Sequence, residues 1–167
     1  MVGMLRYFLI SSMVLLLDQI SKLLTKQYMV LSQSKKILGD FLRYTYIENP
    51  GMAFGIQIGN KMLFTVFSII ASIIVFIYLL RTRGNQRYVK LALAFILGGA
   101  IGNLVDRLLY GSVVDFIDVG IGELRWPVFN IADSAVSIGM VLLIVLILFD
   151  KNAVEEVKEV HSSQSVS

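Results

Sequence analysis

Four long apolar runs dominate the pattern of hydrophobic and polar positions along this chain of 167 residues. The run over 62–80 has 19 residues without a charge, and each of the other three is shorter and contains or borders an acidic residue. A helix needs about 20 largely apolar residues to cross a membrane. The pattern therefore predicts a membrane all-α bundle in a single domain over 1–167, with transmembrane helices at about 5–24, 62–80, 91–109 and 133–149.

The two ends of the chain carry further signals. The first run follows a cation, as a secretory signal peptide would, but no small-residue cleavage site comes after it, and Asp18 and Lys22 interrupt it. We therefore expect a retained helix. The segment 151–167 is polar, and its low hydrophobicity predicts a disordered tail.

The loops between the helices differ in charge density. Loop 81–90 carries four cations in ten residues and no acid, whereas loop 25–61 carries five cations in 37 residues. Cytoplasmic loops of membrane proteins hold an excess of Lys and Arg. We therefore expect loop 81–90 and both termini in the cytoplasm, and loops 25–61 and 107–133 on the outer side.

The outer loops have the composition of strands. Segments 41–47 and 113–119 are rich in aromatic and β-branched residues. Trp126, with Tyr44 and Tyr46, suits the aromatic belt at a membrane–water interface. The sequence thus predicts a small extracytoplasmic β-sheet element resting on the helical bundle.

Composition limits the chemistry that this chain can perform. It is 56% hydrophobic and 16% charged, whereas a soluble domain is about 25% charged. There is no cysteine, and the single histidine, His161, lies in the polar tail. A thiol nucleophile, a disulfide and a two-histidine metal site are therefore excluded. We expect no metal, no cofactor and no nucleic-acid partner.

Polar residues gather where the third predicted helix ends. Asn103 and Asp106 lie three residues apart and share a face, and a buried amide such as Asn103 needs hydrogen-bond partners. Gly98 and Gly102 form a small-xxx-small pair that lets another helix approach closely. The alternative is a structural packing seam with an ion pair between Asp106 and Arg107 at the rim.

Two further acids lie in or beside the predicted helices. Asp18 and Lys22 are four residues apart and can pair on one helix face, which a structural ion pair near the membrane surface would also explain. Asp133 opens the fourth helix three residues after Asn130, where the helix dipole by itself favours an acid.

A pair of aspartates is the best hydrolytic machinery that this composition offers. Two carboxylates in a partly dry site share a proton, because both cannot ionise easily. One can then act as general base on a water while the other acts as general acid. Asp115 and Asp133 are candidates, although Asp115 can also be read as an ordinary loop carboxylate beside Asp118. Because the chain has seven aspartates, the residues alone do not single out one pair.

Five segments resemble the motifs of lipoprotein signal peptidase, or signal peptidase II, in the order and spacing of that family. They are Asp18-Gln-Ile-Ser-Lys22, Asn49-Pro-Gly-Met-Ala-Phe-Gly55, Gly99-Ala-Ile-Gly-Asn-Leu-Val-Asp-Arg107, Val114-Asp-Phe116 and Phe129-Asn-Ile-Ala-Asp-Ser134. Each motif is weak by itself, but the five together are specific and span nearly the whole chain except its tail.

The resemblance implies an aspartyl endopeptidase of the bacterial cytoplasmic membrane. Such a hydrolase removes the signal peptide from diacylglyceryl-modified prolipoproteins just before the lipidated cysteine, near the outer membrane surface. Its expected partners are the lipid-modified prolipoprotein and membrane lipids, it is expected to be a monomer, and the family uses no metal or cofactor. The motif match makes Asp115 and Asp133 the catalytic pair, and makes the substrate-binding or site-shaping residues Asn49, Gly51, Asn103, Asp106, Arg107 and Asn130, supported by Asp18 and Lys22.

Two other function classes share some of these features. A small membrane transporter or proton-relay subunit also has intramembrane acids and glycine-rich helices, but it should hold its acids near the midplane within repeated, broken helices. A membrane scaffold without catalysis would leave Asp115 and Asp133 unrelated in space. The position of the acids along the helices therefore separates a transporter from a peptidase, and the separation of the Asp115 and Asp133 carboxyls separates an enzyme from a scaffold.

Overall fold

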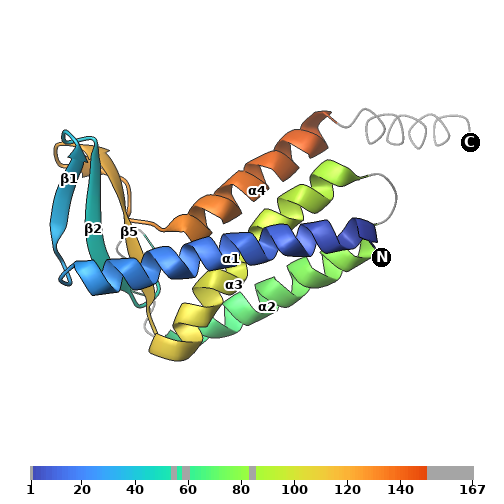
Figure 1. Cartoon of the computed structure of the whole chain (residues 1–167), viewed down its shortest axis with the longest axis horizontal. Coiled ribbons are helices and arrows are strands. Elements are labelled where there is room, and N and C mark those ends of the chain that lie inside the picture. The colour runs from blue at the N-terminus through green and yellow to red at the C-terminus, as the bar shows by residue number, and fades with distance from the viewer. Residues whose placement is uncertain (1, 54–55, 58–60, 83–85, 150–167) are drawn as a thin grey trace, which may run out of the picture.

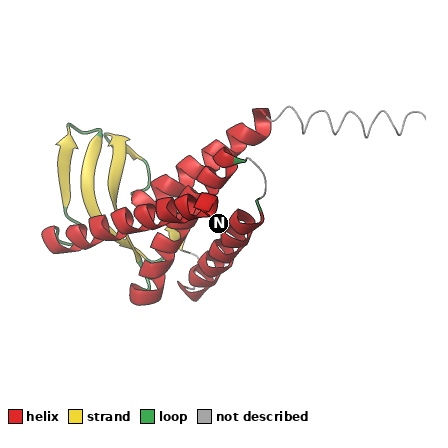
Figure 2. Ribbon diagram, turned by 45° about the vertical axis from the view of Figure 1, so that its right-hand side comes forward, coloured by secondary structure: helices red, strands yellow, loops and turns green. Residues whose placement is uncertain are grey.

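The computed structural model describes residues 2–53, 56–57, 61–82 and 86–149. Four helices form a bundle, and a β-sheet lies across one end of it (Figures 1 and 2). The helices are α1 (Val2–Tyr28), α2 (Lys61–Arg81), α3 (Arg87–Tyr110) and α4 (Ile131–Phe149). All four are long and apolar enough to cross a membrane, so the predicted four-helix membrane bundle with a small sheet is confirmed.

Helix α3 lies at the centre of the bundle and packs against each of the other three helices. Its glycines make this close packing possible. A Cβ atom at Gly98 would lie 2.6 Å from the carbonyl oxygen of Ser11 in α1, and a Cβ at Gly102 would lie 2.7 Å from Oδ2 of Asp18. The predicted small-residue seam therefore brings α1 against α3, beside the polar residues at the end of the bundle.

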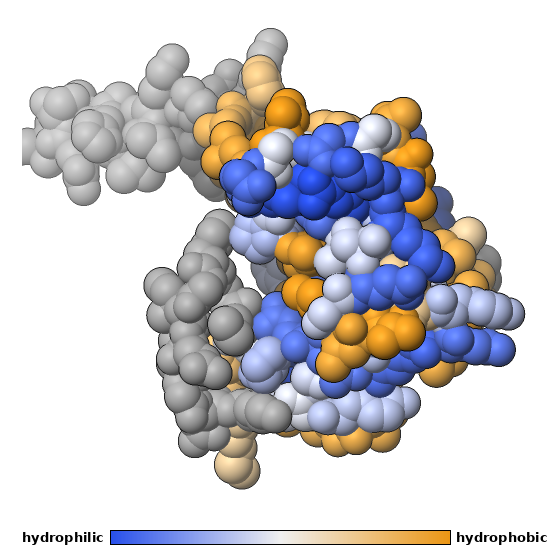
Figure 3. Space-filling model, turned by 90° about the vertical axis from the view of Figure 1, so that its left-hand side faces the viewer, coloured by the Kyte–Doolittle hydropathy of each residue, from blue (hydrophilic) through white to orange (hydrophobic). Residues whose placement is uncertain are grey.

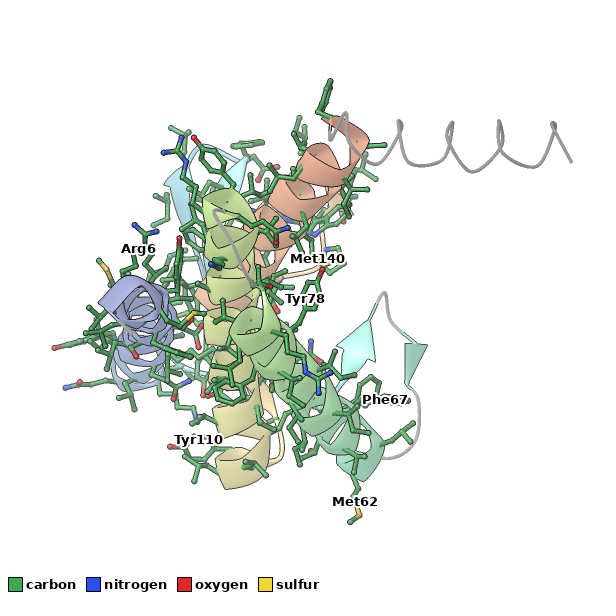
Figure 4. The ribbon with its side chains drawn as sticks, turned by 90° about the vertical axis from the view of Figure 1, so that its right-hand side faces the viewer. Arg6, Met62, Phe67, Tyr78, Tyr110 and Met140 are labelled. Carbon is green, nitrogen blue, oxygen red and sulfur yellow. The ribbon has the colours of Figure 1, made fainter. Side chains whose placement is uncertain are left out.

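The other helices turn most of their apolar side chains outward. Met62, Phe67, Tyr78 and Met140 are all exposed, and Figure 4, which views the bundle from the end opposite the sheet, shows Met62 and Phe67 projecting away from α2. In water such a surface would be unfavourable. In a bilayer it is the surface that contacts lipid.

The main sheet has four antiparallel strands in the order β1 (Ser34–Leu38), β2 (Leu42–Asn49), β5 (Val113–Ile121) and β6 (Leu124–Arg125). A separate hairpin joins β3 (Met52–Ala53) to β4 (Ile56–Gln57). Strand β5 contains the predicted segment 113–119, and β2 contains the segment predicted at 41–47 except Phe41, which lies in the turn before it. The register pairs Ile47 with Asp115 and Asn49 with Val113, so the end of β2 lies beside the start of β5.

Some expectations concern residues outside the described part of the chain. The tail over 151–167, including His161, is among them, as are Phe54 and Gly55 at the end of the second motif. Within the described residues, α1 continues to Tyr28, beyond the expected end near residue 24. Asp18 and Lys22 therefore lie within the helix rather than at its end.

Candidate active site

Asp115 and Asp133 come from opposite sides of the junction between the sheet and the bundle. Asp115 lies on β5 and is only 2% exposed, while Asp133 lies in the first turn of α4. Asn130, immediately before α4, contacts both residues. Its Nδ2 donates to Oδ1 of Asp115 at 2.7 Å, and its backbone N–H donates to Oδ2 of Asp133 at 3.2 Å. The structure thus brings together the two aspartates that the motif match selects from seven.

The start of α4 explains why Asp133 is held so firmly. The backbone N–H of Asp133 donates to Oδ1 of Asn130 at 2.9 Å, and Asp133 accepts the N–H of Asn130 in return. This reciprocal arrangement is a capping box, which satisfies backbone donors that a helix start leaves free. Asp133 is therefore both a capping residue and a member of the candidate pair.

Asn103 on α3 connects the aspartates to the interior of the bundle. Its Nδ2 donates to Oδ1 of Asp133 at 2.7 Å, and its Oδ1 accepts from Nδ2 of Asn130 at 3.1 Å and from Nζ of Lys22 at 2.9 Å. These partners determine which way the amide points. The ammonium requires the oxygen on its side, so the NH2 group must face Asp133.

Asn49, at the end of β2, supports Asp115 from the other side. Its Nδ2 donates to Oδ2 of Asp115 at 3.0 Å, and its Oδ1 accepts the backbone N–H of Gly51 at 3.0 Å. Gly51 has φ +108°, and a Cβ there would lie 2.5 Å from the ring of Phe64 in α2. Only glycine fits this turn, which orients the amide of Asn49 toward Asp115.

A buried ion cluster lies beneath the two aspartates. Nζ of Lys22 is 2.7 Å from Oδ2 of Asp18 and 3.0 Å from Oδ2 of Asp106, so with Asn103 all three donors of the ammonium have acceptors. The predicted Asp18–Lys22 pair therefore forms, and both side chains are buried. The alternative pairing of Asp106 with Arg107 is wrong, because Asp106 pairs with Lys22 and Arg107 donates from Nη1 to Oγ of Ser68 at 3.1 Å.

The carboxylates of this ion cluster also hold the backbone beside each candidate aspartate. Oδ2 of Asp106 accepts the N–H of Val114 at 3.2 Å, one residue before Asp115. Oδ1 of Asp18 accepts the N–H of Ala132 at 2.9 Å, one residue before Asp133. The cluster therefore positions both aspartates through the chain on which they lie.

Gln19 was not among the residues selected from the sequence, yet it belongs to this cluster. Its Nε2 lies 3.0 Å from Oδ1 of Asp106, 3.2 Å from Oδ2 of Asp18 and 3.1 Å from the carbonyl oxygen of Gly102. Its contacts tie α1 to α3. The signal that could have identified it was an amide within an apolar helix, where a polar group requires partners.

Asp118 lies apart from the candidate site. Its Oδ1 accepts from Nε of Arg125 at 2.6 Å, and its Oδ2 accepts from Oγ1 of Thr45 at 2.7 Å. Side chains alternate along a strand, so residues 115 and 118 point to opposite faces of β5. Asp118 is therefore a matched control for Asp115.

A cleft of about 280 Å³ opens beside Asp133. Helix α3 forms its floor with Asn103 and Arg107, while α2 and α4 form its walls with Ser68 and Ser137, among others. The amide, hydroxyl and guanidinium groups offer donors and acceptors of the kind that an extended peptide backbone needs.

The electrostatic setting of Asp115 favours a protonated carboxyl. Burial raises its pKa from the ordinary value of 3.8 to about 7, and the negative charge of Asp133 contributes in the same direction. Hydrogen bonds from Asn49 and Asn130 oppose the shift. Near neutral pH the pair can therefore hold one proton and one negative charge, which general acid–base catalysis requires.

This raised pKa predicts a pH-dependent effect of Asp115→Asn on stability. Between 3.8 and about 7 the folded protein retains a proton on Asp115 that the unfolded chain has lost, so the contribution of Asp115 to stability falls as pH rises through this window. The asparagine variant lacks this loss. We expect its melting temperature relative to wild type to rise between about pH 5 and about pH 8, as thermal unfolding in detergent would measure. A constant difference between the two proteins would contradict the raised pKa.

The acids also separate the competing function classes. Asp106 lies in the last turns of α3, Asp133 in the first turn of α4, and Asp115 on the adjoining sheet. They gather at one end of the bundle, whereas a transporter should hold them near the midplane. Asp115 and Asp133 share Asn130, whereas a scaffold would give them no common partner.

Comparison with known proteins agrees with this architecture. The sequence model of the family described as signal peptidase (SPase) II matches residues 10–149. The lipoprotein signal peptidase of Syntrophus aciditrophicus is 42% identical over 144 residues, which cover 83% of this chain and 89% of that protein. The lipoprotein signal peptidase of Listeria monocytogenes serotype 4a is 36% identical over 152 residues, covering 91% and 99%.

Solved structures show the same fold. Two structures described as a bacterial membrane enzyme superpose with a TM-score of 0.79 at 34% identity. The alignment covers 87% of this chain and 88% and 94% of theirs. The chain therefore belongs to the signal peptidase II family, and is a bacterial multi-pass membrane peptidase of the aspartic type.

Proposed function

We propose that this chain removes the signal peptide from diacylglyceryl-modified prolipoproteins, cleaving just before the lipidated cysteine, with Asp115 and Asp133 as the catalytic pair. The observation that carries the proposal is the link between two carboxyls from separate elements through Asn130, beside a cleft that Asn103 and Arg107 help to line. The relatives named lipoprotein signal peptidase support the substrate class.

The chemistry follows from one proton shared by two carboxyls. The ionised aspartate takes a proton from a water molecule, whose oxygen forms a bond to the scissile carbonyl carbon. The protonated aspartate donates to the carbonyl oxygen. When the tetrahedral intermediate collapses, the C–N bond breaks, and the carboxyl that gained a proton from water delivers it to the leaving amine. A hydroxyl of the intermediate re-forms the carbonyl and returns its proton to the other aspartate. The proton count of the pair is then restored.

The residues around the pair position the reactants. Asn49 and Asn130 donate to Asp115, and Asn103 donates to Asp133, which fixes both carboxyls for transfer. Arg107 lies in the cleft with its guanidinium near Ser68 of α2. We assign it to binding carbonyl groups of the substrate backbone, because a guanidinium is a planar multiple donor.

The active site of this proposal lies on the outer side of the membrane, with both termini in the cytoplasm. The high cation density of loop 81–90 is the basis for this orientation. We expect single cysteines at Lys35 and Glu123 to react with an impermeant thiol reagent in intact cells, and a cysteine at Gln86 to react only after lysis. If only the cysteine at Gln86 reacted in intact cells, the orientation would be the opposite of the proposed one.

We expect the purified protein to cleave a diacylated prolipoprotein much faster than the same precursor without lipid. The site lies where the apolar helices meet the polar sheet, so an acyl-anchored substrate is concentrated and oriented there. Each buried methylene adds about 0.8 kcal/mol of membrane affinity. Turnover of the two precursors in bilayers measures the preference, and a precursor with its cysteine replaced by serine is the control for failed lipidation. Equal rates for both forms would contradict the proposed substrate.

A further inference from the structure

The end of the sheet that is remote from Asp115 has two chemically different faces. This region, which we call the sheet tip, comprises residues 38–43 and 118–126, where the β1–β2 and β5–β6 turns lie side by side. The backbone N–H of Gly120 donates to the carbonyl oxygen of Phe41 at 2.9 Å, and the N–H of Gly122 donates to Asp40 at 2.8 Å. The two turns are therefore one rigid unit.

One face of the sheet tip is polar and internally paired. Asp118 accepts from Arg125 and from Thr45, and Asp40 pairs with Arg43. Arg43 lies opposite Asp118 in the register. Figure 3, which looks at the sheet end of the molecule, shows hydrophilic surface over much of this end, with hydrophobic patches between the hydrophilic ones and along the rim.

The opposite face is apolar and largely exposed. Cross-strand pairing joins Ile121 to Leu124, Val119 to Leu42 and Leu42 to Leu38. The exposed fractions are 74% for Ile121, 85% for Leu124 and 62% for Trp126. Surfaces of this kind mark binding to another apolar phase or molecule. The apolar face of the sheet tip comprises Leu38, Leu42, Val119, Ile121, Leu124 and Trp126.

This apolar face is continuous with the side of the sheet that meets the bundle. Tyr44, two residues from Leu42 and paired with Ile117, points to the same face, and its hydroxyl lies 2.7 Å from Oγ1 of Thr25 in α1. The same face therefore looks toward the transmembrane helices. The strands run across the end of the bundle rather than along it (Figure 1). A bilayer around the four helices would lie next to this face where it extends past them.

We infer that the apolar face of the sheet tip rests in the interfacial layer of the bilayer, with Leu124, Ile121 and Trp126 among the lipid headgroups and upper acyl chains. Aromatic and aliphatic side chains favour this layer, and the paired polar face remains in water. The contact holds β5 at a constant height above the membrane. Because β5 also carries Asp115, the same contact sets the level of the candidate site.

Trp126 is the only tryptophan in the chain, so its fluorescence reports on this contact without any label. We expect the protein in substrate-free phospholipid vesicles to lose about half of its emission when the lipids are brominated on the upper acyl chain, because the indole would lie in the interface. Aqueous iodide should quench it weakly. This readout does not depend on peptidase activity, so it can fail while the proposed function stands.

A matched pair of variants tests the face itself. Leu124→Glu places a charge on the apolar face. Ser34→Glu places the same charge on an exposed position of β1, outside the sheet tip, where Ser34 pairs with Thr45 on the other side of the sheet. We expect Leu124→Glu to shift the emission to longer wavelength and to lose most of the lipid quenching, whereas Ser34→Glu should behave as wild type. Melting temperatures confirm that both variants are folded.

Three results would overturn the inference. Strong iodide quenching with no effect of brominated lipid would place Trp126 in water. Protection from both quenchers would indicate that protein, such as a second copy of the chain, covers the face. Unchanged lipid quenching in a folded Leu124→Glu variant would show that this face does not make the contact.

Discussion

Replacing either Asp115 or Asp133 with asparagine is expected to abolish cleavage of a lipidated prolipoprotein while leaving a folded, inserted protein. An amide has nearly the size of a carboxylate, so the packing around Asn130 should survive. It cannot take a proton from water or return one to a leaving amine near neutral pH. The expected loss in turnover is at least about 10²–10⁴-fold, the contribution of general acid–base catalysis.

The two substitutions should also be strongly non-additive. Each one destroys the same shared-proton arrangement, so the double variant should be hardly slower than either single variant. In the wild type, turnover should follow a bell-shaped curve in pH, because one carboxyl must be ionised and the other protonated. Turnover of each purified variant, with thermal melting as a check on folding, provides the measurement.

Two other aspartates are controls for this experiment. Asp118→Asn should keep most of the activity, because Asp118 points to the opposite face of β5 and contacts Arg125 and Thr45. Asp106→Asn should have an intermediate effect, since Asp106 acts on the backbone of Val114 rather than on the reaction. Near-normal turnover in Asp115→Asn or Asp133→Asn would falsify the catalytic pair.

Replacing Lys22 with methionine is expected to produce the largest loss of stability in this chain. The side chain of Lys22 is 4% exposed and lies between Asp18 and Asp106, which are 0% and 2% exposed. Methionine fills similar volume but leaves two buried carboxylates without their cation. Removing one partner of a buried ion pair costs about 3–5 kcal/mol. A large fall in melting temperature in detergent is the expected result.

Matched variants separate charge from packing. Lys26→Met makes the same chemical change one turn later, where the ammonium lies 3.6 Å from the centroid of the Tyr110 ring, and should cost only about 0.5–1 kcal/mol. Adding Asp18→Asn to Lys22→Met should restore part of the lost stability, because it removes one of the unpaired charges. If Lys22→Met melted at the wild-type temperature, the buried cluster would not stabilise the fold.

The apolar pattern by itself determined the four transmembrane helices and the two inner strands. Helix α2 contains the 19-residue uncharged run, and β2 and β5 cover the aromatic and β-branched segments except Phe41. These features are local, because the spacing of apolar residues within one element indicates its type and which of its sides is buried. Strand β1, with the sequence SKKIL, is exposed at every position, so it carries no such pattern and was not predicted.

The motifs also selected the residues of the candidate site before their contacts were known. A buried amide or carboxylate within an apolar helix is costly, so such residues stand out as candidates in the sequence. Asn103, Asp18 and Asp106 are of this kind. The sequence could not say which of these groups pair. Asp106 could as well have paired with its neighbour Arg107 as with Lys22, since the sequence does not record which helix faces pack together.

Only the tertiary structure decided the pairings, because they join positions that are far apart along the chain. Lys22 meets Asn103 across 81 residues, and Asn49 meets Asp115 across 66. Such contacts depend on how the helices pack along their glycines and on the register of β2 against β5. The local spacing of apolar residues predicts neither the packing nor the register. The sequence therefore determined the membrane fold and the candidate residues, while helix packing and strand register determined that Asp115 and Asp133 share Asn130.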